Sequence, residues 1–219
     1  MRNKRGLYKK SNKFFIAIEN HVNQNIKEYF TISLIFIIGI VMGVILVNCS
    51  SVENQNSITG YVNGFIQSIK NREYTIDGGK LITKSILSNL KLACIIWIVG
   101  STIIGIPIIY GIVGYKGLCI GYSISAIIAT LGNAKGITFA LGTMLAQNII
   151  AIPCILALAV SSMKLHAFII KIKGKDDIKG EIYRHTMFSL IMASGLILSS
   201  FLEYLFTMSI FSDIMINFI

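Results

Sequence analysis

Long apolar runs, separated by shorter polar segments, dominate the chain. A run of about 20 apolar residues crosses the hydrocarbon core of a bilayer, about 30 Å thick, as a single helix. The pattern therefore predicts an all-α fold: a polytopic integral membrane helical bundle of about five transmembrane helices that form one membrane domain. The predicted spans are residues 30–47, 92–113, 115–131, 136–163 and 186–211.

Basic residues are unevenly distributed among the polar segments. If the amino terminus is cytoplasmic, the cytoplasmic segments are residues 1–29, a tight turn near Lys116 and residues 164–185, which together hold 14 Lys and Arg. The segments on the other side, which include the 48–91 loop, hold six. Because cytoplasmic segments of membrane proteins are enriched in Lys and Arg, this excess predicts an amino terminus inside and a carboxyl terminus outside.

The 48–91 segment is the largest predicted extracytoplasmic piece, and part of it is amphipathic. Its apolar residues follow helical spacing until Asp77-Gly78-Gly79 ends the helix. An apolar stripe has to be hidden from water, so we expect it to lie on the membrane surface, to pack on the outer mouth of the bundle or to bind a partner. The stripe consists of Ile58, Tyr61, Val62, Phe65, Ile66 and Ile69.

Composition supports a membrane protein and argues against a nucleic-acid partner. Hydrophobic residues make up 54% of the 219 positions and charged residues 14%, whereas about a quarter of a soluble domain is charged. The mean hydropathy is +0.71. The net charge of +10 comes from cations that lie between the apolar runs, and no nucleic-acid-reading motif accompanies them. We therefore expect the lipid bilayer, and no nucleic acid, as a partner.

Two adjacent amides, Gln147 and Asn148, lie in the middle of the fourth span, five residues before Pro153. Polar groups are costly in hydrocarbon, so these side chains should face protein or water. Pro153 frees the carbonyl of Ile149, which either amide could satisfy. We favour interhelical hydrogen bonds around a kink and keep a contact with a substrate or partner as the alternative.

Small residues recur at helical spacing in the first and third spans. Gly39 and Gly43 form one GxxxG motif, and Gly117 and Gly121 form another. Such motifs let two helix backbones approach closely and gain dispersion contacts. We expect packing within this chain, with association to another membrane protein as the alternative.

Residues that could carry chemistry are few. Glu203 is the one acid within the predicted spans, and its predicted place near the outer interface favours a solvated end residue over a proton relay. The three histidines, His21, His166 and His185, all fall in predicted cytoplasmic segments without a metal-ligand spacing. The four cysteines are isolated, and no nucleophile motif occurs. The sequence therefore predicts no catalytic residue, no metal site and no cofactor.

Three stretches, in this order and spacing, resemble the stage II sporulation protein M family. They are SILSNLKLACIIWIVGSTIIGIPIIYGIVGYKGLCIGYSISAII, LGTMLAQNIIAIPCILALAVSSMKL and SGLILSSFLEYLF. They match the family's Asn-containing second helix with a Gly-rich link into the third, its amide-and-proline fourth helix, and its last helix with a glutamate near the end. A basic amino-terminal segment, a lone first helix and an outer loop complete the resemblance.

This resemblance implies a role in endospore formation, during engulfment of the forespore by the mother-cell membrane. The protein would be a non-enzymatic scaffold or anchor for two peptidoglycan hydrolases, an amidase/endopeptidase and a lytic transglycosylase. It would lie in the bacterial cell membrane, by resemblance the mother-cell membrane. The catalysis would belong to the partners.

A departure from the broader group of relatives strengthens the structural interpretation. Where those relatives carry a His-Gly pair and a following Glu, this chain has Gln147, Asn148 and Ala151. The alternative hypothesis is a small transporter or channel subunit that uses the polar, kinked fourth helix. Against it stand the absence of a sequence repeat and the lack of charge in that helix.

Overall fold

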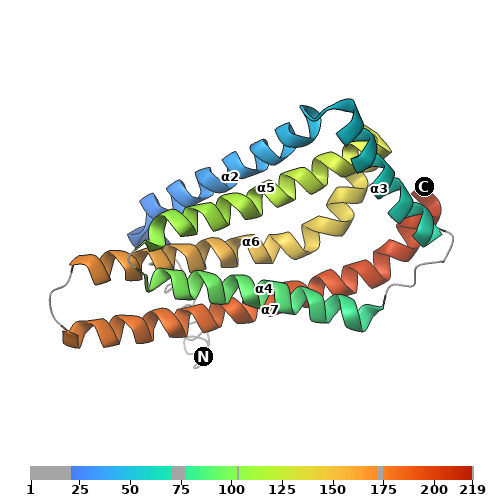
Figure 1. Ribbon diagram of the computed structural model, residues 1–219. Helices are drawn as coiled ribbons and strands as arrows, with labels where there is room; N and C mark the ends of the chain where they lie inside the picture. Colours follow the sequence, from blue (N-terminus) through green and yellow to red (C-terminus); the bar gives the residue numbers. More distant parts are fainter. Residues whose placement is uncertain (1–20, 71–76, 103, 172–174, 219) are drawn as a thin grey trace, which may run out of the picture.

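The structure is a computed structural model that describes residues 21–70, 77–102, 104–171 and 175–218 (Figure 1). Within these ranges the chain is helical and forms no strand. The labelled helices are α2 (Ile26–Asn48), α3 (Val52–Lys70), α4 (Gly78–Gly100), α5 (Gly105–Leu131), α6 (Asn133–Lys171) and α7 (Lys175–Phe218).

Five of these helices are long and apolar enough to cross a membrane: α2, α4, α5, the 147–171 part of α6 and the 178–207 part of α7. They run side by side and alternate in direction (Figure 1). We call the end of the bundle where α2 begins the amino end, and the opposite end, where α3 lies, the α3 end. The predicted all-α, five-span bundle is confirmed.

The predicted boundaries of the second and third spans are wrong. α4 ends at Gly100 and α5 begins at Gly105, so the predicted turn near Lys116 lies inside α5. The second span begins at Gly78 because Asp77 caps α4: its Oδ1 accepts hydrogen bonds from the backbone N–H of Gly79 at 3.0 Å and of Lys80 at 3.2 Å. The polar first turns of α4 hid this start from a search for apolar runs.

Pro107 explains why the third span begins where it does. It lies in the first turn of α5, where a residue without an N–H removes no intrahelical hydrogen bond. The apolar run across residues 92–113 therefore contains the end of one helix, a turn and the start of the next helix.

The last two helices are longer than predicted. α6 covers 39 residues and α7 covers 44, so the predicted 164–185 loop is helical on both sides of residues 172–174, which lie outside the described residues. The predicted 48–91 loop consists of α3 and the first half of α4, apart from residues 71–76, which also lie outside them. Polar residues can continue a helix beyond the apolar part that a bilayer requires, so hydropathy alone marks only the membrane-embedded portion.

α6 forms the centre of the bundle, since it contacts each of the other four spanning helices. It contains Pro153 without ending there, and it bends along its length (Figure 1), as a helix with an internal proline does. The interior around it is apolar and closely packed. The fully buried side chains of this interior come from all five spanning helices and include Ile32, Ile96, Ile109, Ile155, Leu158 and Leu196.

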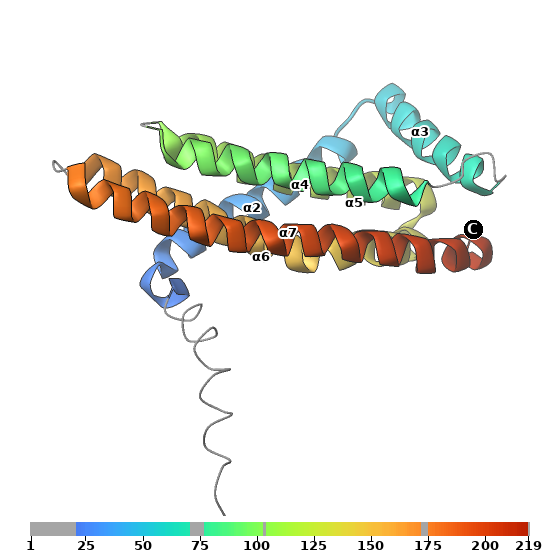
Figure 2. The ribbon, with the colours of Figure 1, turned by 90° about the horizontal axis from the view of Figure 1, so that it is seen from below.

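α3 does not join the bundle as a parallel member. It packs against α5 and lies obliquely at the end of the bundle, running from the end of α2 towards the carboxyl end of α7 (Figure 1 and Figure 2). This helix therefore presents a part of the chain that the bundle does not cover.

Candidate functional site

The two GxxxG motifs lie against each other at the contact between α2 and α5. A Cβ atom added to Gly39 would lie 2.2 Å from the carbonyl oxygen of Gly114, and one added to Gly121 would lie 2.1 Å from that of Ile40. Gly43 and Gly117 are equally close to the facing backbone. All four glycines thus serve helix packing within this chain, and these faces are already occupied.

Gln147 and Glu203, which lie far apart in the sequence, are brought together through Ser85. The Gln147 amide donates a hydrogen bond to Ser85 Oγ at 3.3 Å, and Ser85 Oγ in turn donates to Glu203 Oε2. The three residues come from α6, α4 and α7 and are half-buried. A carboxylate thus lies beside the amide of the central helix, linked to it by one hydroxyl.

Asn89, one turn further along α4, continues this set of contacts. Its side chain is only 3% exposed. Its amide donates to Ser200 Oγ at 2.8 Å and lies 3.5 Å from Ser199 Oγ, both on α7. We call the whole set the polar cluster: Ser85, Asn89, Gln147, Ser199, Ser200 and Glu203.

The sequence did not identify the α4 members of the polar cluster. Ser85 and Asn89 fell within the predicted 48–91 loop, where a polar residue attracts no notice. A helix starting at Asp77 would have put both inside a span, and their four-residue spacing would have placed them on one face.

Asn148 and Pro153 do not join the polar cluster. The Asn148 amide donates to the carbonyl oxygen of Met144 in its own helix at 2.8 Å. Among the hydrogen bonds of the described residues, neither Asn148 nor Gln147 donates to the Ile149 carbonyl, for which the sequence offered either amide as a donor. The adjacent amides therefore have different roles: Gln147 joins helices, and Asn148 bonds locally.

Two histidines that we placed in a cytoplasmic loop are buried in the bundle instead. His166 on α6 is 5% exposed, and its Nδ1 lies 2.7 Å from the Thr102 carbonyl oxygen, which ties the α4–α5 turn to α6. His185 on α7 is 3% exposed, and its Nδ1 lies 2.8 Å from Ser161 Oγ on α6. Each histidine has a packing partner, and no group of three metal-ligating side chains occurs among the described residues.

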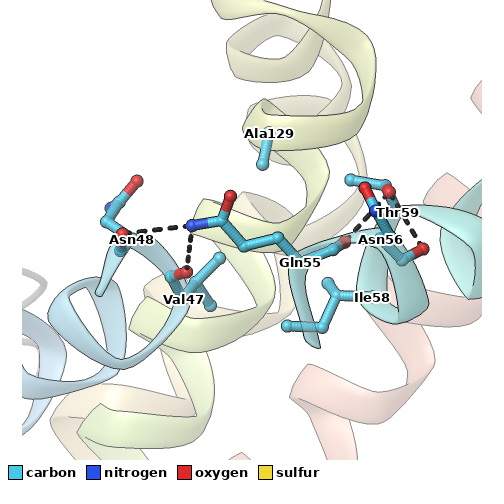
Figure 3. Close-up of a pocket in the computed structure, with 7 residues that line it drawn as sticks. All are labelled: Val47, Asn48, Gln55, Asn56, Ile58, Thr59 and Ala129. Atoms are coloured by element: carbon cyan, nitrogen blue, oxygen red, sulfur yellow. Dashed lines mark hydrogen bonds between the residues drawn. The ribbon is translucent and has the colours of Figure 1, made fainter. Parts of the chain in front are cut away.

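A small cavity of about 150 Å³ marks the junction of α2, α3 and α5 at the α3 end (Figure 3). Gln55 of α3 lines it, and its amide reaches the last carbonyls of α2, at 3.4 Å from Val47 O and 3.1 Å from Asn48 O. These carbonyls have no partner within their own helix. Gln55 therefore caps α2 and fixes the start of α3 to the bundle.

Much of the described surface of α3 is exposed. Tyr61 is 81% exposed and Val52 74% exposed, and a Cβ atom at Gly60 or Gly64 would meet nothing within 4 Å. Ile58 instead lines the small cavity. Val62 is half-buried, and the side chains of the other three stripe residues, Phe65, Ile66 and Ile69, lie outside those that the structure describes.

Comparison with known proteins gave one finding. The model of the family described as stage II sporulation protein M matches residues 32–208, most of the chain. No curated protein and no solved structure matched the chain. The match extends from α2 into α7 and includes every member of the polar cluster.

Proposed function

Because the chain belongs to the stage II sporulation protein M family, we propose that this sporulation-related membrane protein is a non-enzymatic anchor of a peptidoglycan-remodelling complex for forespore engulfment. The chemistry resides in two partners, an amidase/endopeptidase and a lytic transglycosylase. The chain holds them at the leading edge of the mother-cell membrane. The observation that carries the proposal is the family match over residues 32–208.

The interior of the bundle supports an anchoring role. Every buried side-chain nitrogen and oxygen among the described residues has a hydrogen-bond partner. Between the polar cluster and the contact of His185 with Ser161, the interior is filled by apolar side chains that include Ile155, Leu158 and Leu196. Such an interior keeps helices together, which is what a scaffold needs.

The distribution of cations supports an orientation that directs α3 towards the cell wall. Lys27, Lys164, Lys171, Lys179 and Arg184 all lie near the amino end of the bundle. Because cytoplasmic segments are enriched in Lys and Arg, this end belongs on the cytoplasmic side. The exposed α3 is then extracytoplasmic, where peptidoglycan hydrolases work.

The test is co-purification from sporulating cells. The detergent-solubilised protein is isolated through an affinity tag, and the accompanying proteins are identified by mass spectrometry. We expect both hydrolases to be recovered with it, and we expect deletion of the gene to arrest engulfment. Recovery of neither hydrolase, together with normal engulfment in the deletion strain, would refute the proposal.

A matched pair of variants tests whether α3 is the docking element. Tyr61→Ala removes an exposed aromatic ring from α3, and Tyr115→Ala removes a comparably exposed ring from the spanning helix α5. We expect Tyr61→Ala to reduce recovery of the hydrolases and Tyr115→Ala to leave it unchanged. Equal recovery with both variants would move the docking surface away from Tyr61.

A transporter or channel subunit is the second candidate, and the contact from Gln147 through Ser85 to Glu203 favours it. Ionisable side chains within spanning helices often mark substrate or ion paths. Single cysteines placed along residues 140–155 distinguish the two functions. A water-filled path makes one face of α6 react with a polar thiol reagent, whereas a packed scaffold leaves that face unreactive.

A further inference from the structure

A second cavity, of about 510 Å³, lies at the amino end of the bundle. Four helices line it: the beginnings of α2, α5 and α7 and the last two turns of α6. These four helix ends lie together in Figure 1. The cavity is well within the range of about 300–1,000 Å³ that small-molecule sites occupy.

Cations outnumber acids on the walls of this cavity. Lys27, Lys164, Lys171 and Arg184 line it, against Glu28 and Glu181. The acid Glu181 is already paired, since its Oε1 accepts from Arg184 Nη2 at 2.5 Å. The three lysines make no ion pair with any residue that the structure describes. The cavity therefore holds uncompensated positive charge.

The positive charges of the cavity also act on His21, which precedes α2 and is not part of the lining. Burial lowers its pKa, and the positive charges of Lys164 and Arg184 lower it further. The two charges come from α6 and α7, so the positive potential at this end arises from more than one helix. The beginnings of α2 and α5 add to it, because the amino-terminal end of a helix carries a partial positive charge, and the carboxyl end of α6 offsets part of this contribution.

Most of the rest of the lining is apolar or aromatic, and Asn25 and Thr31 are its uncharged polar members. The apolar and aromatic side chains are those of Ile106, Tyr110, Met163, Ala167 and Phe168. A small inorganic anion would leave this apolar surface without a partner, whereas a ligand with an anionic head and an apolar tail would cover both parts. The cavity also lies where spanning helices end, which is the depth of lipid headgroups in a bilayer.

We propose that this cavity binds the phosphate of an anionic phospholipid headgroup, with Lys164 and Lys171 of α6 as its principal contacts and the apolar lining against the first part of an acyl chain. The inference does not depend on the proposed function, because it concerns the isolated protein. It makes the amino end a lipid-selective site that favours membranes rich in phosphatidylglycerol or cardiolipin.

Native mass spectrometry of the purified full-length protein tests the proposal, with phosphatidylglycerol and phosphatidylcholine titrated separately. We expect clear preference for phosphatidylglycerol in the wild type. Each removed cation should weaken phosphatidylglycerol binding about fivefold, so the double variant Lys164→Gln/Lys171→Gln should lose most of the preference. Equal binding of both lipids by the wild-type protein would overturn the proposal.

The matched control is Lys84→Gln/Lys135→Gln, which removes two exposed lysines at the α3 end. It should leave the lipid preference unchanged, and an equal loss in both double variants would show a non-specific charge effect and overturn the proposal. If the α6 double variant fails to fold, the exposed Lys27→Gln should still weaken phosphatidylglycerol binding, and no weakening in that folded variant would also overturn it.

Inorganic phosphate and soluble glycerophosphoglycerol separate the two sources of a phosphate group. Both should compete poorly with the lipid, because neither covers the apolar lining. If inorganic phosphate displaces phosphatidylglycerol as effectively as a second lipid does, the cavity is a site for free phosphate and the lipid proposal is wrong.

Discussion

Asn89 is a polar residue that is buried between α4 and α7. Its amide is almost fully enclosed and joins α4 to α7 through Ser200. Ser199 and Ser200 also donate to the carbonyl oxygen of Leu196 in their own helix, so both retain a partner if the amide is removed. The contribution of Asn89 is therefore specific to the contact between the two helices.

We expect Asn89→Ala to lower the free energy of unfolding by about 1 kcal/mol, as interhelical hydrogen bonds in membrane proteins contribute about 0.6 to 2 kcal/mol. Denaturant titration in detergent micelles measures the change. The control is Ser88→Ala on the exposed side of α4, which should have little effect. An equal loss in both variants would show that the Asn89 contact contributes nothing particular.

His21 provides a pH-sensitive contact at the amino end. Its ring stacks on Phe188 of α7, with centroids 4.6 Å apart, and its Nδ1 lies 3.2 Å from the Tyr29 hydroxyl of α2. Burial, followed by the charges of Lys164 and Arg184, lowers its pKa below the ordinary value of about 6.5. The folded protein thus prefers a neutral His21.

Stability should therefore fall on acidification. Below a pH of about 6.5 the unfolded chain binds a proton that folded His21 resists, so the free energy of unfolding decreases until the pH passes below the folded-state pKa. Unfolding measured between about pH 7.5 and about pH 5 should show this decrease. His21→Gln should reduce the pH dependence, and an unchanged dependence would assign it to other groups.

At the scale of the helices, the contact between α2 and α5 depends on missing side chains. Gly39, Gly43, Gly117 and Gly121 bring the two backbones so close that an added methyl group would overlap a carbonyl oxygen. This packing gains dispersion contacts along both helices. The α2–α5 pair is therefore the part of the bundle most sensitive to a small increase in side-chain volume.

Gly121→Ala should lower the free energy of unfolding by about 1–3 kcal/mol, the usual cost of overpacking a well-packed contact. Gly111→Ala on the same helix is the control, since a Cβ atom there meets nothing within 4 Å and alanine favours the helix. It should be neutral or stabilising. Parallel denaturant titrations compare the two, and equal destabilisation would contradict the packing account.

At the scale of the whole molecule, the central question is which side of the membrane each end faces. Among the described residues, Lys27, Lys164, Lys171, Lys179 and Arg184 lie near the amino end, whereas fewer cations, Lys80, Lys84 and Lys135 among them, lie near the α3 end. The positive-inside rule therefore predicts that α3 is extracytoplasmic and that the start of α7 is cytoplasmic.

Cysteine labelling of intact cells checks this orientation. In a background without the four native cysteines, Asn56→Cys on α3 should react with a membrane-impermeant thiol reagent, and Lys179→Cys on α7 should not. Permeabilised cells provide the control, in which both should react. The reverse pattern in intact cells would invert the orientation and place the proposed docking helix in the cytoplasm.

The amino-acid sequence alone determined that this chain is a helical membrane protein with five spans, because a bilayer demands both about 20 apolar residues per crossing and internal hydrogen bonding of the backbone. It also identified Gly39, Gly43, Gly117 and Gly121 as close-packing positions. These properties depend on residues within one segment, so a local pattern is enough to read them.

The tertiary structure decided where the helices turn and which polar side chains meet. The α4–α5 turn falls within an apolar run, where Thr102 is held by His166, a residue 64 positions away. Ser85 meets Glu203 across 118 positions. Such contacts depend on how separate helices pack against one another, and the spacing of residues within one segment does not predict that packing. The number of spans was therefore evident from the sequence, whereas the α4–α5 turn, the polar cluster and the cavity at the amino end required the folded bundle.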